Sequence, residues 1–300
     1  MRWDIGTVYK TIRKAKGITQ QEICGDWISR FNLSKFESNQ SVPSYETMEF
    51  LLNQIDMSFG EFEYICNHYK PQTRQMIINQ MSNHLSTSDS TELIKIAQLC
   101  KEHLKKVEHD LPIQHILETL NIIIEIRKNS FSDHSRELAE AMWSDLKRRD
   151  IWYKNDFNML GVILFIFPIE TLQDITEKIL INLEKYKDYK SIKNAQVSLL
   201  LNLSTIYLCN QLLDDCEHIS AIALDLAKQL KRYDFLGFAQ VRLGICQAND
   251  ELTRKGLSLL ELTEETKLLE DLQEEVKQYR ASYFSHISHG ISTTSIETEK

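Results

Sequence analysis

The sequence has few residues that end helices, because its 300 residues include only 9 glycines and 4 prolines. Such a scarcity of breakers is typical of a chain that is almost entirely helical. Hydrophobic residues make up 42% and charged residues 26% of the chain, which is the composition of a soluble globular protein. At this length at least two domains are expected. The sequence therefore predicts an all-α protein of two or more domains.

The sequence also lacks the patterns of membrane segments, metal sites and catalytic centres. It has no run of about 18 apolar residues, and its N-terminus lacks a signal-peptide core. Its six cysteines show no CxxC or Cys/His spacing of a zinc site. HExxH, GxSxG and glycine-rich phosphate loops are absent from the sequence. We therefore expect a cytoplasmic protein without a membrane partner, metal or cofactor, and not an enzyme.

The net charge of −8 argues weakly against a nucleic-acid partner. The local field matters more than the bulk charge, however. Four basic residues lie within residues 10–16, at Lys10, Arg13, Lys14 and Lys16. On the predicted first helix, residues 3–16, we expect the apolar side chains to face inward and these basic residues to face outward. Much of the acidic charge lies later, as in residues 261–275.

Residues 17–39 predict a helix, a tight turn and a second helix. Thr19 and Glu22 have the spacing of a capping box, and a Gly-Asp pair follows at residues 25–26. Ser29 caps the second predicted helix, on which Leu33 and Phe36 belong to the apolar face. Its other face carries Arg30, Asn32, Ser34 and Lys35. A braced helix with small polar and basic side chains outward is suited to reading the major groove of DNA.

This segment resembles the helix-turn-helix of the phage-repressor class, also called XRE or Cro/CI. The resemblance is carried by GITQQEI at residues 17–23 and by ISRFNLSKFESN at residues 28–39. The segment between the helices is one residue shorter than usual, and Asn39 occupies a position where glycine is common. Asparagine tolerates the left-handed conformation, so the helix end is expected to survive. A helical hairpin with a Thr cap and no DNA role is the alternative.

The resemblance also implies which side chains would contact DNA. Arg30 and Lys35 would meet guanine O6 and N7, and Phe31 would touch a thymine methyl group or else belong to the core. Phosphate contacts are expected from Gln20, Ser34, Asn39 and Gln40, with Ser29 at the start of the recognition helix. The alternative for any one of them is a solvated surface side chain.

Five short helices are expected in residues 1–69, which form the DNA-binding domain. Ser44 and Ser58 would cap the fourth and fifth helices. Residues 70–288 then predict amphipathic helices at rough spans of 72–85, 89–107, 112–128, 131–149, 152–167, 169–187, 190–209, 212–231, 234–248, 250–269 and 271–287. Breaks near residues 168, 211 and 250 recur at the period of a TPR-like (tetratricopeptide-like) solenoid of helix pairs. Residues 289–300 are expected to be a frayed tail.

This order of domains resembles the Rgg/MutR regulators of Gram-positive bacteria. The residues that carry the resemblance are Ile12–Lys16 running into the helix-turn-helix, the serine-rich second helix, and the segment WYKND at residues 152–156. The resemblance implies transcriptional control, usually activation, by a homodimer that binds two DNA half-sites and responds to a short signalling peptide. A repressor without peptide input and a solenoid that only binds proteins are the alternatives.

A peptide-binding site is expected on the inward helices of the repeats. Asn155, Asn158 and Asn202 would hold the peptide backbone, because an amide can donate and accept hydrogen bonds together. Gln240 and Arg242 are placed on the same face. Trp152 and Tyr153 would hold apolar peptide side chains, or the aromatic residues belong to the core. The last helices would form the dimer through Leu257, Leu260, Leu268 and Leu272, unless these leucines only stack the final repeats.

Overall fold

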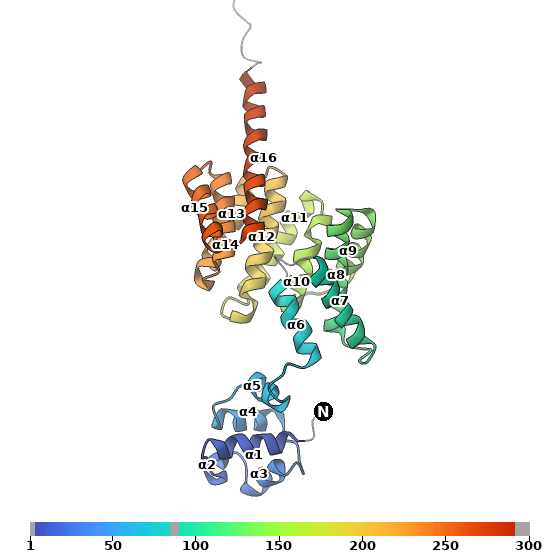
Figure 1. The fold of residues 1–300 in the computed structure, drawn as a ribbon, viewed down its shortest axis with the longest axis vertical. Helices are drawn as coiled ribbons and strands as arrows, with labels where there is room; N and C mark the ends of the chain where they lie inside the picture. Colours follow the sequence, from blue (N-terminus) through green and yellow to red (C-terminus); the bar gives the residue numbers. More distant parts are fainter. Residues whose placement is uncertain (1–3, 85–89, 292–300) are drawn as a thin grey trace, which may run out of the picture. The chain divides into compact units, whose positions relative to one another are not determined.

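A computed structural model of the chain describes residues 4–84 and 90–291. All regular structure in those two ranges is helical, as Figure 1 shows, and the predicted all-α fold is confirmed. The chain divides into two compact units, Met1–Asn83 and His84–Lys300. The sequence predicts the boundary at residues 69/70. No described helix combines the length and the apolar character needed to cross a membrane.

The N-terminal unit contains α1–α6. Their bounds are α1 Ile5–Ala15, α2 Gln20–Cys24, α3 Arg30–Glu37, α4 Tyr45–Gln54, α5 Phe59–Cys66 and α6 Thr73–His84. Helices α2–α5 each begin after a hydroxyl side chain that accepts a backbone N–H of the first turn, as the sequence predicts for Thr19, Ser29, Ser44 and Ser58. At α2 both bonds of the predicted capping box form.

The core of the N-terminal unit gathers around Tyr9 of α1, which is fully buried. Its ring packs on Phe36 of α3 with 5.4 Å between centroids, and its hydroxyl donates to the Leu51 carbonyl of α4 at 3.0 Å. Burial raises the pKa of Tyr9, so the hydroxyl stays a donor at ordinary pH. Tyr9 thereby joins three helices through one satisfied polar side chain.

The second unit contains α7–α16. Their bounds are α7 Ser90–Leu104, α8 Leu111–Asn129, α9 Asp133–Leu146, α10 Lys154–Ile163, α11 Ile169–Glu184, α12 Lys193–Cys209, α13 Leu213–Leu230, α14 Tyr233–Cys246, α15 Asp250–Leu262 and α16 Thr266–Ile291. Short 3-10 turns, η1 Leu164–Ile166 and η2 Lys190–Ile192, flank α10 and α12.

The eleven predicted spans match α6–α16 one for one, but the predicted break before the last helix is wrong. The chain turns at residues 263–265, where Glu264 has a φ of +58°, and not at residue 270. A glutamate carries no turn signal, but its left-handed backbone closes α15 through two hydrogen bonds: Glu264 N–H donates to the Glu261 carbonyl at 3.1 Å, and Glu265 N–H donates to the Leu260 carbonyl at 3.0 Å. Of the expected tail, residues 289–291 belong to α16, and residues 292–300 lie outside the described residues.

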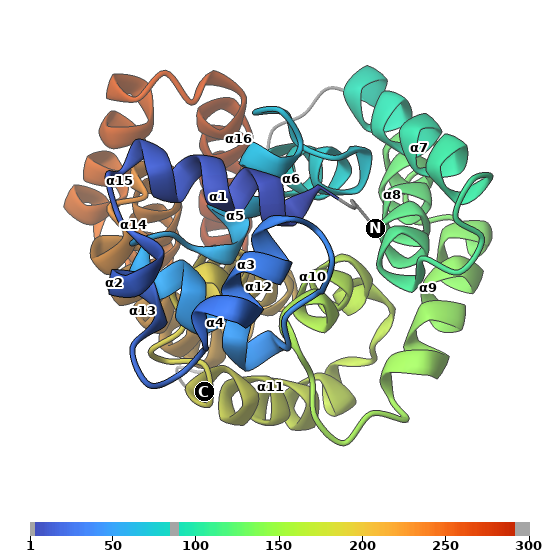
Figure 2. The same ribbon diagram turned by 90° about the horizontal axis from the view of Figure 1, so that it is seen from below.

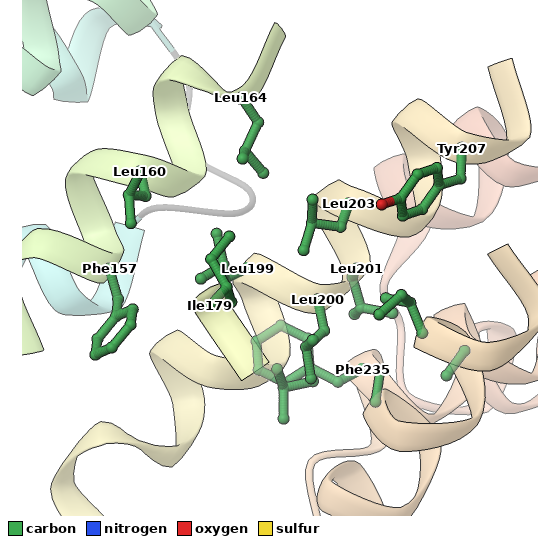
Figure 3. Packing of buried hydrophobic residues seen from close by; sticks show 14 of the residues in the cluster. Phe157, Leu160, Leu164, Ile179, Leu199, Leu200, Leu201, Leu203, Tyr207 and Phe235 are labelled. Atoms are coloured by element: carbon green, nitrogen blue, oxygen red, sulfur yellow. The ribbon is translucent and has the colours of Figure 1, made fainter. Parts of the chain in front are cut away.

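In the second unit the helices from α7 to α10 and from α12 to α16 each pack against the next helix, and the even-numbered helices also pack against one another. Helices α8, α10, α12, α14 and α16 each contact the next member of this even-numbered series. Figure 2 shows α7, α8 and α9 at one end of the unit and α13, α14 and α15 at the other. The shared core lies between α10, α11, α12 and α14, as Figure 3 shows for Leu160, Ile179, Leu200 and Phe235. This is the predicted TPR-like stack.

Helices α14 and α15 approach closely because glycines face their contact. A Cβ added to Gly244 would lie 2.3 Å from Oγ1 and 2.6 Å from the backbone nitrogen of Thr253. A Cβ on Gly256 would lie 2.6 Å from the Gly237 carbonyl oxygen. These neighbours are mostly backbone atoms, which cannot move aside as a flexible side chain could. The crossing therefore excludes any larger residue at these positions.

We expect Gly244→Ala to lower the free energy of unfolding by about 1–3 kcal/mol or more, because the added methyl group overpacks the α14–α15 contact. Gly161→Ala on α10 is the matched control. Its Cβ would meet the nearest side-chain atoms at 3.6 Å and 3.7 Å, which is ordinary contact. The control should stabilise the chain by up to about 1 kcal/mol through helix propensity. Urea unfolding followed by circular dichroism measures both; equal effects would contradict the packing argument.

Candidate functional site

Helix α3, the predicted recognition helix, is fixed to α1 by a buried ion pair. Arg13 Nε and Nη2 donate to the two carboxylate oxygens of Glu37 at 2.5 Å and 2.9 Å, and Arg13 Nη1 donates to the Ile18 carbonyl at 2.5 Å. The hydrogen bond to Glu37 raises the pKa of Arg13, so the guanidinium stays charged. The prediction that Arg13 faces outward is wrong, since it is 5% exposed. The reason is Glu37, 24 residues away, which supplies the buried countercharge.

Two of the predicted phosphate contacts take part in the same framework. Gln20 Nε2 donates to Glu37 Oε2 at 2.8 Å, which fixes the amide at the start of α2. Asn39 has a φ of +58°, the left-handed conformation expected for it. Its Oδ1 accepts the Gly6 N–H at 2.8 Å, and its Nδ2 donates to Thr7 Oγ1 at 2.7 Å. Both side chains therefore have structural partners before any DNA is considered.

Gly6 is a residue that the sequence analysis missed. A Cβ there would lie 1.8 Å from the Phe36 carbonyl oxygen and 2.9 Å from Asn39 Oδ1. The end of α3 therefore rests directly on the backbone of α1, and only glycine leaves room for this. A glycine inside a predicted helix was the one available signal, since it costs helix stability and calls for a packing reason.

The outer face of α3 presents polar, basic and aromatic side chains together. Ser29 Oγ accepts the Asn32 N–H at 3.2 Å, and Leu33 and Phe36 are buried beneath the helix. The residues exposed around this face are Ser29, Arg30, Phe31, Ser34, Lys35 and Gln40. The core alternative for Phe31 is wrong, because its side chain is 66% exposed.

Charge and aromatic surface are arranged together on this face. Lys35 Nζ lies 4.3 Å from the centroid of the Phe31 ring, one helical turn away, which is a cation–π contact. Neither Arg30 nor Lys35 has an ion-pair partner within the described part of the chain. Their charges are therefore available to an anionic partner.

In the repeat unit, the predicted amide residues lie on three stacked helices, α10, α12 and α14. Asn155 and Asn158 of α10 are half-buried, and within the described residues their side chains make no hydrogen bond. Asn202 of α12 is exposed and donates to the Gly161 carbonyl of α10 at 3.0 Å. The amides of Asn155 and Asn158 are therefore the ones free to bind a peptide backbone.

The two predicted aromatic residues differ in exposure. Trp152 is fully buried, with Nε1 donating to the Leu146 carbonyl at 3.2 Å and with Lys178 Nζ 4.4 Å from its ring. It lies in the repeat core and presents no surface to a ligand in this conformation. Tyr153 is 62% exposed, so it is the one of the pair that a ligand could reach.

Arg242 of α14 is also fully buried. Its Nη1 lies 2.8 Å from Glu275 Oε1 of α16, and its Nη2 donates to Thr205 Oγ1 of α12 at 3.1 Å. The contact with Glu275 is an ion pair by distance but is not aligned as a hydrogen bond, and Nε has no hydrogen-bond partner. Burial raises the pKa of Glu275 even though Arg242 opposes the shift. Gln240 is 6% exposed, and its Oε1 has no partner.

Of the four leucines expected in a dimer surface, Leu260 and Leu272 are buried in the chain's own core and cannot form it, while for Leu257 and Leu268 the dimer contact stays a prediction. Leu260 is fully buried and Leu272 is 2% exposed in the repeat core, while Leu257 and Leu268 pack against that core from its edge. Within one chain they stack α15 and α16 on the preceding repeat. Their helical spacing could not distinguish this from a dimer contact, because both need the same apolar stripe.

Within the described residues, no group of three or more His, Cys, Asp or Glu side chains is placed to hold a metal ion. The arrangement offers instead two kinds of binding surface. One is the exposed face of α3 with its unpaired cations, and the other is the amide-bearing face of α10.

No protein-family model matches the chain, and no curated protein sequence matches it either. Several solved structures share its fold. A putative transcriptional regulator from Listeria monocytogenes is 15% identical, with a TM-score of 0.72 over 94% of this chain and 99% of that one. The pheromone receptor Rgg2 of Streptococcus dysgalactiae is 14% identical, with a TM-score of 0.66 over 91% and 99%. PlcR of Bacillus thuringiensis, solved with the peptide PapR7 and DNA, is 16% identical, with a TM-score of 0.67 over 90% and 98%.

We expect Arg242→Met to lower the free energy of unfolding by about 3–5 kcal/mol, because it leaves Glu275 without its countercharge. Adding Glu275→Leu should restore most of that loss, so the double variant is more stable than the single one. Urea unfolding of the wild type and both variants measures this; a double variant no more stable than Arg242→Met would contradict it.

The pH dependence gives a second readout of the same pair. The pKa of Glu275 is raised in the folded state. Protonated Glu275 therefore contributes stability that is fully present below the unfolded pKa of 4.5 and is lost as the pH rises through the folded pKa. The Arg242→Met variant should therefore regain stability as the pH falls from 7 toward 4.5, and the double variant should not.

Proposed function

We propose that this protein is a DNA-binding transcriptional regulator of the Rgg/MutR type, controlled by a short peptide bound in its repeat unit. The observation that carries the DNA-binding part is the face of α3. Arg30 and Lys35 project from a capped helix, have no ion-pair partner among the residues that the structure describes, and flank the exposed ring of Phe31. Beneath them the Arg13–Glu37 pair holds the helix in one orientation.

The face of α3 would read base edges in the major groove. Arg30 and Lys35 are suited to guanine O6 and N7, and Phe31 to a thymine methyl group. Ser34 and Gln40 would contact phosphate, and Gln20, already fixed by Glu37, would do so from the start of α2. One such helix makes few contacts, so we infer a homodimer on two half-sites. Its interface would exclude Leu260 and Leu272, which are buried within the chain.

Peptide control is supported by the fold and by the free amides of α10. Rgg2 is a pheromone receptor, and PlcR was solved with its peptide and DNA. An extended peptide presents unpaired amide and carbonyl groups about every 3.3 Å, and burying one unpaired costs roughly 1–3 kcal/mol. Asn155 and Asn158 can satisfy both kinds of group, and Tyr153 offers an aromatic side chain nearby. Binding would occur in the cytoplasm and involve no catalysis.

Changing Arg30 or Lys35 to Ala should weaken binding to the operator by roughly 1–3 kcal/mol and relax the preference at one base pair. Gln20→Ala should weaken binding more uniformly across sequences, because it removes a phosphate contact. Operator fragments recovered by chromatin capture provide the probe, and fluorescence anisotropy gives the affinities. Lys14→Ala, an exposed lysine of α1, is the matched control. Unchanged base preference in Arg30→Ala would contradict the placement of α3.

Changing Asn155 to Ala should lower affinity for the short peptide encoded beside the gene by roughly 1–3 kcal/mol, with little change in melting temperature. Because the side chain of Asn155 makes no hydrogen bond within the described residues, removing its amide group should not disturb the fold. Asn210→Ala is the control, since that amide is exposed and caps its own helix at the Ile206 carbonyl. Calorimetry and thermal melts measure the two effects. A large fall in melting temperature with unchanged peptide affinity would make Asn155 structural.

A further inference from the structure

Two connections of the repeat unit lie together at one edge. The first joins α9 to α10, and the second joins α11 to α12 through η2. Lys154 Nζ donates to Ser191 Oγ at 2.8 Å, across 37 residues of sequence. Lys178 Nζ donates to the Arg149 carbonyl at 3.4 Å. Residues 147–154 and 184–193 therefore form one surface, which we call the basic edge.

The basic edge carries a local excess of positive charge. Its two segments contain eight lysines and arginines against three acidic residues, in a chain whose net charge is −8. Three of the cations are neutralised locally, by the pairs Arg148–Asp145, Arg149–Asp156 and Lys187–Glu184. The other five have no ion-pair partner within the described residues: Lys147, Lys154, Lys185, Lys190 and Lys193, of which Lys154 donates to Ser191 Oγ.

Exposed tyrosines lie among these lysines. Tyr153 is 62% and Tyr189 is 54% exposed. Tyr186 supports Tyr189 from behind, with 6.2 Å between ring centroids, and itself packs edge-on against the buried ring of Phe157 at 6.1 Å. Tyr189 is therefore packed against the core through Tyr186, and it directly precedes Lys190 in the sequence.

We propose that the basic edge binds the phosphate backbone of duplex DNA, as a contact separate from α3. Lysine and tyrosine side chains are common donors to phosphate oxygens. Lysine is depleted from interfaces between proteins, so an unpaired lysine cluster is better suited to phosphates than to a protein surface. This inference goes beyond the proposed function, which places DNA only on α3.

The test is the salt dependence of binding to a long duplex of mixed sequence, measured by fluorescence anisotropy on the full chain. The edge variant is Lys147→Gln/Lys185→Gln/Lys190→Gln. The control variant, Lys101→Gln/Lys105→Gln/Lys106→Gln, removes the same charge from exposed lysines at the end of α7. The edge variant should reduce the slope of log K against log salt by about 2–3, since each phosphate contact contributes about 0.9. The control should change it by less than about 0.5.

An edge variant that behaves as the control does would overturn the inference. The same holds if the edge variant keeps its DNA binding but loses binding to polyglutamate, because the partner would then be an acidic polypeptide. Repeating the series in Arg30→Ala/Lys35→Ala separates the two proposals. If the salt slope of the Arg30→Ala/Lys35→Ala variant still falls when the edge lysines are changed, the separate contact is supported. If the Arg30→Ala/Lys35→Ala variant keeps its operator affinity, the role of α3 is contradicted, and the result for the basic edge is unaffected. Thermal melts of all variants confirm that each is folded.

Discussion

The buried pair of Arg13 and Glu37 is the interaction on which the N-terminal unit depends. It joins the last turn of α1 to the last residue of α3, and through Gln20 it also fixes the start of α2. Removing one partner would leave a charge buried without compensation, which is far more costly than losing an exposed pair. The close contact of Gly6 with the end of α3 also fixes α3 against α1. The exposed face of α3 is therefore presented by a rigid support, as a surface that reads base edges requires.

The polar side chains of the repeat unit are of two kinds: some are buried and join helices, and others could bind a ligand. Arg242 and Glu275 join α14 to α16, and Thr205 extends that contact to α12. Trp152 and Gln240 are similarly enclosed. Asn155, Asn158 and Tyr153 differ because they keep free polar groups or exposed surface on α10. We therefore place the proposed peptide-binding site on α10 and the helices next to it. Arg242 and Trp152 are buried and hold the repeat helices together.

Charge is distributed unevenly along this acidic chain. Arg30 and Lys35 of α3 and five lysines of the basic edge have no ion-pair partner within the described residues, while Lys228 and Lys277 pair within their own helices. A lysine already paired with a carboxylate binds a phosphate weakly. An unpaired lysine that neutralises a phosphate releases a counterion from the DNA. Net charge alone would have missed both surfaces, because the field that a partner meets is local.

The sequence by itself determined the helices, their caps and their repetition. The capping box at Thr19, the caps at Ser29, Ser44 and Ser58, and the spans of the repeat helices all depend on residues within a few positions of one another. The left-handed conformation of Asn39 could also be predicted from the sequence alone, since asparagine tolerates this conformation more readily than most residues do.

Only the tertiary structure decided which of these residues are buried or paired. Arg13 meets a partner 24 residues away, Asn39 meets Gly6 across 33, and Arg242 meets Thr205 across 37. The leucines of α15 and α16 show an apolar stripe whether they face their own core or a second chain. A pattern of spacing reports that a side chain has a preferred face, but what lies against that face depends on helices brought together from distant parts of the chain.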